Sequence, residues 1–422
     1  MTKTPLGMIL YRAVATLADP FISLWFALRL RKGKEDKSRF GERLGFSNKR
    51  RPRGPLVWLH GASVGETISI LPLIQKFREE RPDLNVLVTS GTVTSARLMK
   101  ERLPDGVIHQ FAPIDHWFAV RRFMERWRPD VSVFVESELW PEMLYQSPRP
   151  MLIGGRMSAR SAKRFRKFRW FWLPLLRRLR PCLAQTDDYA RRFKAAGAGH
   201  VSVGGNLKDD APELPVDQKR LTTWKKHLAG RKVLLAASTH EGEDDAILTA
   251  HEELKRKSED LLTIIVPRHP DRGAAIAEAA SKMAPTQRYS ENQELDKDTR
   301  ILVADTIGDM GLWYRLATVA VVGGSFIPHG GQNPLEAVRL GCPVVCGPYM
   351  FNFDETVKHL NQYKLLTQVS DVPQLLNSLA LFFEVKNHRA QAIKNAAQAM
   401  DELGDITQVA MDAIIDRMEG VA

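Results

Sequence analysis

Short runs of apolar residues alternate with longer stretches of helical periodicity along the whole chain. We expect strands at 56–60, 85–89, 107–111, 131–135 and 151–153, and again at 232–237, 261–266, 300–303, 318–322 and 343–346. Helix-like segments of roughly 10–15 residues separate these runs, for example 66–80 and 243–258. This alternation is typical of parallel α/β sheets, and it occurs twice.

The length of the chain and one polar segment divide it into domains. A single core stops growing beyond about 250–300 residues, and this chain has 422. The polar, proline-containing stretch NLKDDAPELPVDQ indicates a linker at 207–218. The predicted organisation is a membrane-associated N-terminal segment (1–30), two Rossmann-like domains (31–206 and 219–400) facing a central cleft, and a C-terminal helix (401–422) that crosses back to the first domain.

Cysteine usage and absent motifs exclude several classes of protein. Cys182, Cys342 and Cys346 form no CxxC pair and no metal-ligand set with the histidines, which argues for a reducing compartment and against a disulfide scaffold. The chain has no GxxxxGK[ST] motif and no GxGxxG motif after a first strand, so P-loop and dinucleotide chemistry are unsupported. A nucleotide site in this fold would lie at the carboxyl ends of the strands without either motif.

Charge is divided unevenly between the two halves. Residues 1–206 hold 37 Lys and Arg against 18 Asp and Glu, a net charge of +19. Residues 207–422 hold 24 against 31, a net charge of −7. A basic half suggests an anionic partner, and nucleic acid and membrane lipid are both candidates.

The N-terminal segment favours lipid. Residues 6–28 are mostly apolar, but Arg12, Asp19 and Pro20 interrupt them and argue against a clean transmembrane span. No small-residue cleavage site follows, which argues against a secretory signal peptide. The basic flank 29–53 carries eleven Lys and Arg and three acids, which predicts a cytoplasmic position for the following chain. We expect a monotopic or single N-terminal anchor; the alternative is a buried helix with a solvated charged tail.

A second basic segment points the same way. Residues 156–186 contain ten basic residues, five aromatic residues and no acid. Such a segment could bind RNA or a phosphorylated amphiphile. The apolar N-terminus favours the amphiphile, so anionic membrane lipid is the predicted partner and nucleic acid is not.

The stretch VVGGSFIPHGGQNPLEAV at 321–338 is the richest candidate for ligand binding. The glycines before Ser325, including Gly324, let the backbone approach a ligand closely. Asn333 is the expected N-cap of a helix with Pro334 in its first turn. Glu336 in that turn suits ribose hydroxyls better than phosphate. The alternative is a structural helix in which Glu336 offsets the helix dipole.

Three further loops follow strands of the second half. Arg268 comes directly after the strand that ends near Pro267, where a guanidinium suits bidentate phosphate binding; the alternative is an ion-paired surface arginine. ADTIGDMG at 304–311 and STHEGE at 238–243 are the other two. Four loops at strand ends predict a nucleotide site.

Acidic residues follow two strands of the first half. Glu66 opens a helix after the glycine-rich stretch VWLHGASVGET, where a carboxylate could accept a proton from an attacking hydroxyl. The commoner use of such an acid is to offset the helix dipole. Glu136 and Glu138 are two residues apart, and we expect them to point to opposite faces, so that at most one faces the ligand.

Taken together, the motifs resemble a known family. In order along the chain these are WLHGASVGE, VESELWPEML, GNLKDD, STHEGEDD, VPRHPDR, DTIGDM, GGSFIPHGGQNPLEA and GPYMFNF. They are similar to motifs of the 3-deoxy-D-manno-octulosonic acid (Kdo) transferases, glycosyltransferase family 30, which are GT-B enzymes of lipopolysaccharide synthesis. The match runs from about residue 10 to about 370, and no single motif would suffice.

The resemblance implies a function and a set of site residues. It implies an inner-membrane enzyme on the cytoplasmic face that transfers Kdo, with inversion, from CMP-Kdo to the lipid A precursor lipid IVA. It implies no cofactor and no obligatory metal. Glu66 would be the catalytic base, with Glu136 and Lys208 as transition-state stabilisers. The nucleotide contacts would be Pro267, Arg268, Ile307, Gly308, Asp309, Gly324, Ser325, Asn333, Pro334, Leu335 and Glu336. The acceptor contacts would be Ser63, Gly65, Arg156, Ser158, Arg160 and Ser161.

Some positions depart from the family pattern. Gln332 stands where the family usually has His, Ile307 and Asp309 stand where Met and Glu are frequent, and Glu142 replaces Asn. Independently of these departures, two other interpretations stay open. One is a different GT-B enzyme, either a sugar-nucleotide epimerase or a soluble glycosyltransferase. The other is a non-enzymatic RNA-binding protein. The number of Kdo residues added, the acyl-chain preference and the oligomeric state are not encoded in any motif.

Overall fold

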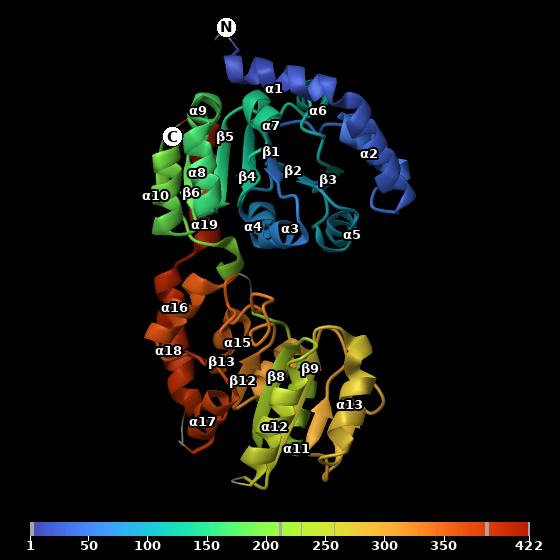
Figure 1. Cartoon of the computed structure of the whole chain (residues 1–422), viewed down its shortest axis with the longest axis vertical. Helices are drawn as coiled ribbons and strands as arrows, with labels where there is room; N and C mark the ends of the chain where they lie inside the picture. The colour runs from blue at the N-terminus through green and yellow to red at the C-terminus, as the bar shows by residue number, and fades with distance from the viewer. Residues whose placement is uncertain (1–3, 211–212, 229, 257, 385–387, 421–422) are drawn as a thin grey trace. The chain divides into compact units, whose positions relative to one another are not determined.

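The chain forms two compact units, and each is built on one parallel sheet (Figure 1). The computed structural model describes residues 4–210, 213–228, 230–256, 258–384 and 388–420. Unit 1 comprises residues 1–211 and 405–422, and unit 2 comprises residues 212–404. The chain therefore leaves unit 1 within the segment expected to be a linker and returns to it at Asp405.

Unit 1 contains a seven-stranded sheet in the order β3-β2-β1-β4-β5-β6-β7, with every neighbouring pair parallel. Its strands are β1 Leu56–His60, β2 Asn85–Ser90, β3 Ile108–Phe111, β4 Val131–Val135, β5 Pro150–Gly155, β6 Cys182–Ala184 and β7 Val201–Val203. The chain builds outward from β1 to one edge, then returns to β4 and builds to the other edge. The direction thus reverses between β1 and β4, and ligands of open α/β sheets bind at such a reversal.

Helices cover both faces of this sheet. They are α1 Leu6–Leu17, α2 Asp19–Arg31, α3 Val64–Ser69, α4 Leu71–Glu80, α5 Val93–Arg102, α6 Trp117–Trp127, α7 Pro141–Gln146, α8 Ala159–Lys167, α9 Arg169–Leu176, α10 Asp187–Ala196 and α19 Ile406–Glu419, with the 3₁₀ helices η1 Lys37–Leu44 and η2 Leu207–Asp210. Alternate residues of β1 enter different cores: Val57 packs in one cluster and Trp58 in the other. Burial of both faces explains why the strands read as continuous apolar runs rather than as alternating ones.

The N-terminal segment forms two helices instead of one. Helices α1 and α2 meet at Ala18 and are bent by 58°, and Pro20 lies in the first turn of α2, where proline is tolerated. Arg12 of α1 forms an ion pair of 2.5 Å with the fully buried Glu142 of α7. The polar residues that interrupt the apolar run thus hold the segment against unit 1.

The last helix, α19, packs on unit 1 against α4 and η2. Its Ile406 and Ile414 belong to the same buried cluster as Val57 of β1. The Thr407 N–H donates a hydrogen bond of 2.6 Å to the Asp210 carboxylate at the end of η2. A helix from the C-terminal end of the chain therefore fixes the segment that carries Lys208.

Unit 2 repeats the architecture with the strand order β10-β11-β9-β8-β12-β13-β14, again all parallel. Its strands are β8 Lys232–Thr239, β9 Leu261–Pro267, β10 Thr286–Arg288, β11 Ile301–Val303, β12 Val319–Val322, β13 Val344–Cys346 and β14 Leu366–Gln368. Its helices are α11 Gln218–His227, α12 Asp244–Lys255, α13 Gly273–Ser281, α14 Met310–Leu316, α15 Leu335–Arg339, α16 Asp354–Gln362, α17 Val372–Glu384 and α18 His388–Leu403, with η3 Pro270–Arg272. Here the direction reverses between β8 and β12.

The predicted fold class, two parallel α/β sheets, is confirmed. All ten predicted strands exist, and four edge or near-edge strands of three residues each, β6, β7, β10 and β14, were missed. Short length alone is not the reason, because β11 and β13 also have three residues, but those two are wholly apolar and buried. By contrast, β7, β10 and β14 contain polar or partly exposed residues. The predicted helix 66–80 is wrong as one element, because α3 ends at Ser69, Ile70 lies between the helices, and α4 begins at Leu71 with Pro72 in its first turn.

Candidate active site

Glu66 lies at the reversal point of unit 1, just beyond the carboxyl end of β1. Ser63 is the N-cap of α3, and its hydroxyl accepts a hydrogen bond of 3.3 Å from the Glu66 N–H. In return the Ser63 N–H donates one of 2.9 Å to Glu66 Oε2. This reciprocal capping box holds the carboxylate in place. Glu66 also lies in the first turn of α3, as the dipole role considered from the sequence requires. The capping box uses Oε2 only, and within the described residues Oε1 has no hydrogen bond.

The surroundings of Glu66 favour its protonated form. Its side chain is buried, with the residue only 7% exposed. Burial raises the pKa of Glu66 above its ordinary value, and the nearby carboxylates of Glu138 and Glu136 raise it further, while the hydrogen bonds from Ser63 oppose the shift. A carboxylate whose pKa is raised is a stronger base than an ordinary glutamate, as general-base catalysis requires.

Glu136 and Lys208 form an ion pair beside this carboxylate. Lys208 Nζ lies 2.6 Å from Glu136 Oε1, and Arg156 Nη1 lies 3.5 Å from Glu136 Oε2. A side-chain atom added at Gly65 would lie 3.8 Å from Lys208 Nζ, which places the lysine next to the loop of Glu66. Three residues predicted from the motifs, Glu66, Glu136 and Lys208, are therefore brought together by the fold.

The expectation that Glu136 and Glu138 point to opposite faces is wrong. Residues two apart on an extended strand share one face, so strand alternation does not support that expectation. In addition, β4 ends at Val135, and Glu136 has a left-handed backbone with φ +55°. Both carboxylates lie near enough to Glu66 to raise its pKa. Glu138 also accepts a hydrogen bond of 2.6 Å from the Trp140 indole and lies 3.8 Å from His60 Nε2. A left-handed non-glycine residue costs about 1–3 kcal/mol and is concentrated at functional sites.

The predicted acceptor residues separate into two groups. Ser63, Gly65 and Arg156 lie around the three acidic and basic side chains just described. Ser158 is instead the N-cap of α8; its hydroxyl accepts a hydrogen bond of 3.1 Å from the Ser161 N–H and donates one of 3.0 Å to Ser161 Oγ. Arg160 is exposed in the first turn of the same helix.

In unit 2 an internal carboxylate occupies the glycine-rich loop. Glu243, which follows β8, accepts hydrogen bonds from the N–H groups of Gly324, Ser325 and Phe326 at 2.7, 3.0 and 3.0 Å. The Ser325 hydroxyl is fully buried and accepts a hydrogen bond from the Gly347 N–H. These three N–H groups therefore shape the loop and are not free to bind a ligand. Sequence reasoning missed Glu243, although it lies in the quoted STHEGE loop.

Arg268 and Glu336 lie near each other at the carboxyl edge of the second sheet. Arg268 is exposed after β9, and its N–H donates a hydrogen bond to the Thr239 carbonyl. Burial raises the pKa of Glu336, and the charge of Arg268 partly offsets that shift. Asn333 does not occupy the N-cap position, which belongs to Pro334, but its Oδ1 accepts the Leu335 N–H at 3.0 Å. The helix that follows, α15, has only five residues.

The three residues predicted at 307–309 differ in how they are placed. Ile307 is 87% exposed, and Gly308 has a left-handed φ of +99°. Asp309 forms an ion pair of 2.9 Å with Arg220 and accepts a hydrogen bond of 2.7 Å from Thr306. Its carboxylate therefore has internal partners, and Gly308 and Asp309 line a small cavity of about 180 Å³.

Three histidines gather at the strand ends of unit 2. The rings of His240 and His329 are 4.1 Å apart, and those of His240 and His269 are 6.2 Å apart. Burial lowers the pKa of His240, and His329 lowers it further, so its ring is neutral at pH 7. Gln332, one of the departures from the family pattern, lies 3.0 Å from His240 Nε2. The sequence analysis did not predict this cluster, although one histidine lies in each of three loops that follow strands.

Two further findings concern metal binding and membrane-spanning helices. Within the residues that the structure describes, no group of three or more His, Cys, Asp and Glu side chains is arranged to hold a metal ion. In the same residues no one helix has the length and apolar character to cross a bilayer, although α1 and α2 together pass that test as a bent pair.

Comparison with known proteins gives the family. Residues 38–211 match the family described as 3-Deoxy-D-manno-octulosonic-acid transferase (kdotransferase). The chain is 30% identical to the 3-deoxy-D-manno-octulosonic acid transferase of Rickettsia bellii, over 95% of this chain and 98% of that protein. It is 34% identical to a probable mitochondrial 3-deoxy-D-manno-octulosonic acid transferase of Arabidopsis thaliana, over 93% of this chain and 92% of that protein.

Solved structures show the same fold at low sequence identity. A glycosyltransferase from Rickettsia africae matches with a TM-score of 0.60 at 10% identity, over 88% of this chain and all of that one. The UDP-GlcNAc 2-epimerase of Neisseria meningitidis matches with a TM-score of 0.58 at 15% identity, over 86% of this chain and all of that one. These likenesses show the GT-B fold, which is common to transferases and epimerases, whereas the near full-length relatives decide between them. The chain belongs to the 3-deoxy-D-manno-octulosonic acid transferase family of glycosyltransferases.

Proposed function

We propose that this Kdo transferase uses CMP-Kdo as donor and the lipid A precursor lipid IVA as acceptor in lipopolysaccharide core assembly, with inversion at the anomeric carbon and Glu66 as general base. The observation that carries the proposal is the buried Glu66 carboxylate, with its pKa raised by burial and its position held by the Ser63 capping box. A transfer of this kind needs a base that removes a hydroxyl proton.

In the proposed step the acceptor hydroxyl oxygen attacks the anomeric carbon of Kdo. Its proton passes to Glu66, a new C–O bond forms, and the bond from the anomeric carbon to the CMP phosphate oxygen breaks. The CMP phosphate leaves with the electron pair. Because Oε2 of Glu66 accepts the Ser63 N–H, Oε1 is the oxygen proposed to take the proton.

Lys208 is proposed to stabilise negative charge during this step. The group it would neutralise is the Kdo carboxylate or the departing phosphate. Glu136 holds the ammonium at 2.6 Å, and η2 is anchored through Asp210 to α19. A positive charge that is already in position lowers the activation barrier, because the side chain does not have to move when negative charge develops.

Unit 2 is proposed to bind CMP through its strand-end loops. Arg268 would pair with the phosphate and Glu336 would accept hydrogen bonds from ribose hydroxyls. The loop at 324–326 would contribute its shape, set by Glu243, rather than free N–H groups. The proposal requires no cofactor and no metal ion.

The membrane is the proposed source of the acceptor. Helices α1 and α2 expose a set of large apolar side chains, each at least 46% exposed: Leu6, Ile9, Leu10, Val14, Leu17, Phe21, Leu24, Trp25 and Leu28. Phe171 of the basic segment packs against Gly7 of α1, while Trp170 beside it is 54% exposed. Arg12 and Asp19 face protein partners, Glu142 and His116. This arrangement favours a monotopic attachment to anionic lipid at the cytoplasmic face of the inner membrane.

A transfer assay tests the proposal. Purified protein in detergent would receive freshly generated CMP-Kdo and tetraacyl lipid A precursor, and mass spectrometry would read the products. We expect a gain of one Kdo mass or more, and the number of gains reports how many residues are added. No gain, while calorimetry still detects CMP binding, would refute the assigned acceptor.

A further inference from the structure

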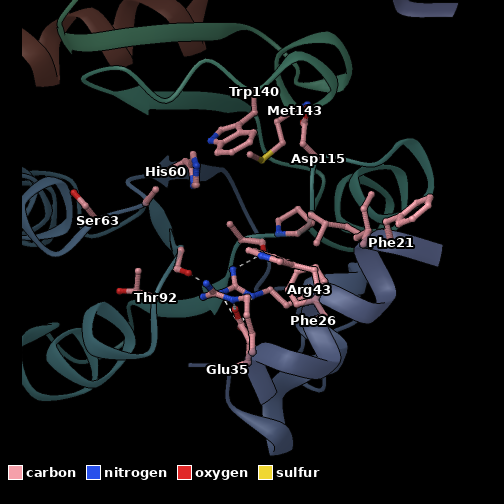
Figure 2. A pocket seen from close by; sticks show the side chains of 18 residues that line it. Phe21, Phe26, Glu35, Arg43, His60, Ser63, Thr92, Asp115, Trp140 and Met143 are labelled. Atoms are coloured by element: carbon pink, nitrogen blue, oxygen red, sulfur yellow. Dashed lines mark hydrogen bonds and ion pairs between the residues drawn. The ribbon is translucent and has the colours of Figure 1, made fainter. Parts of the chain in front are cut away.

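A cavity of about 850 Å³ lies in unit 1 between α2 and the carboxyl ends of its central strands (Figure 2). On one side α2 contributes Phe21, Ile22, Trp25 and Phe26, and on the other lie Trp140 and Met143. Apart from Ser63 and the exposed side chains of α2, the residues that line it have no role in the proposed function. Its size falls within the range of roughly 300–1,000 Å³ found for ligand sites.

The charged groups in its wall are occupied by one another. Arg43 donates to Glu35 at 3.0 Å and also to the carbonyls of Ala112 and Gly91. The second oxygen of Glu35 accepts a hydrogen bond of 2.8 Å from Arg29. Because these charges are paired with each other, they offer neither a free cation nor a free anion to a ligand. They therefore form part of the cavity wall and do not bind a charged group.

The remaining acid in the wall is satisfied as well. The Asp115 carboxylate accepts the Tyr11 hydroxyl at 2.7 Å and the N–H groups of Glu142 and Met143 at 3.1 and 2.8 Å. One imidazole nitrogen differs: His60 Nε2 is buried without a hydrogen bond in the described structure and lies 3.8 Å from Glu138. The cavity thus presents mainly apolar surface, and the buried imidazole of His60 lies in its wall.

The two ends of the cavity lead to different places. At its inner end it is lined by Ala62 and by Ser63, whose N–H holds the Glu66 carboxylate. At its outer end it is lined by Phe21 and Trp25, which are 75% and 52% exposed on the apolar face of α2. The cavity therefore connects the surface proposed to meet the membrane with the loop of the proposed base.

We propose that this cavity binds one acyl chain of the acceptor. The polar end of the acyl group would lie beside His60 and Ser63, and its hydrocarbon tail would lie under α2. The inference rests on the proposed function and extends it by naming where the lipid part of the acceptor is held. An acyl chain fits because the wall offers no unpaired charge, and because the outer opening lies on an apolar face that a lipid can cross without entering water.

We expect such a pocket to affect the position of the bound acceptor more than its affinity. A chain that leaves a bilayer or a micelle for the pocket exchanges one apolar environment for another, so little free energy is gained. A chain held at a fixed depth, however, sets the distance between its sugar and Glu66. Misplacement of a reacting group by about 1 Å can lower a rate on the order of 10²-fold.

Photocrosslinking tests the location of the chain directly. The probe is a tetraacyl acceptor that carries a diazirine in the middle of its acyl chains, mixed with the full-length protein in detergent. We expect labels on Phe26, Trp140 and Met143, which line the cavity. Labels confined to Leu17, Leu24 and Leu28, which are exposed on the outer face, would show that the chains stay outside and would overturn the proposal.

A matched pair of variants tests the consequence for activity. Ile22→Trp places a larger side chain in the cavity, whereas Ser23→Trp adds the same group to an exposed position of α2 outside it. The readout is the ratio of kcat/KM for the long-chain acceptor to that for the same disaccharide with four-carbon chains. We expect the ratio to fall at least about tenfold in Ile22→Trp and to be retained in Ser23→Trp. Equal ratios in both variants would refute the proposal.

The wild-type protein separates failure of this inference from failure of the proposed function. Transfer to neither acceptor would count against the proposed acceptor class. Transfer to both with the same kcat/KM would leave the proposed function standing and overturn the pocket, because a chain that is not held cannot influence the rate.

Discussion

Replacing Glu66 by glutamine separates the chemical role of this side chain from its structural one. The carbonyl oxygen of the introduced amide can still accept the Ser63 N–H, so the capping box at the start of α3 is preserved. What disappears is the ability to take up a proton. Loss of a general base costs roughly 10²–10⁴-fold in kcat, which corresponds to about 2.7–5.4 kcal/mol of transition-state stabilisation.

The same substitution makes an opposite prediction for stability. Because the pKa of Glu66 is raised in the folded protein, its ionised form opposes folding. That cost is absent below the unfolded-state pKa and fully present above the raised folded-state pKa. Glu66→Gln is therefore expected to be at least as stable as wild type at pH 7–8, with the difference vanishing as the pH falls below that of an ordinary glutamate.

The assay is single-turnover transfer across a pH series, together with thermal denaturation of each variant. In wild type, kcat/KM should fall as the pH drops through the raised pKa of Glu66, since the protonated acid cannot act as a base. Thr186→Ala, which removes the N-cap of α10 in the same unit, is the control: about 1 kcal/mol less stable but unchanged in rate. A folded Glu66→Gln protein that retains near-normal transfer would refute the reasoning.

Three further predictions follow from individual contacts. Lys208→Met removes the partner that lies 2.6 Å from Glu136, beside Glu66, so the pKa of Glu66 should rise further. The acid limb of the pH–rate profile should then move to higher pH, and the plateau rate should fall. A lower plateau with an unmoved acid limb would contradict the coupling between Lys208 and Glu66. Arg12→Ala and Glu142→Ala should show a coupling of about 1–3 kcal/mol in a double-mutant cycle of urea unfolding, whereas additivity would mean that the pair does not hold α1. Glu243→Ala leaves three N–H groups at 324–326 without their acceptor, and each unsatisfied group costs about 1–3 kcal/mol. CMP binding and thermal stability should therefore both fall. Glu241→Ala, at an exposed position of the same loop, should change neither.

The sequence predicted correctly which loops follow strands and lie at the same edge of a sheet. Because parallel strands end at one edge of a sheet, Glu66 and Glu136 were expected at the same edge, and the order of the strands brings β1 and β4 together there. The sequence did not predict which groups in those loops have partners within the protein itself. Glu243 takes the N–H groups of Gly324 and Ser325, and Asp309 is taken by Arg220.

The departures from the family pattern gain an explanation only from packing. Glu142, which replaces the usual Asn, is fully buried and pairs with Arg12 across 130 residues of sequence. The arginine that interrupts the apolar N-terminal run is therefore part of the attachment of that run to unit 1. Neither residue indicates the other by spacing, because no local rule links a helix at the N-terminus to one that follows β4.

By itself the sequence determined the two parallel α/β sheets, the positions of their strand-end loops and, through the order of its motifs, the transferase family. These features depend on periodicity and turn chemistry within a few neighbouring residues. Only the tertiary structure decided that Lys208 lies 2.6 Å from Glu136, that the pKa of Glu66 is raised, and that a cavity opens between α2 and Trp140. Each of these depends on distances between side chains far apart in the chain, which are set by how the strands are ordered and how the helices pack on them.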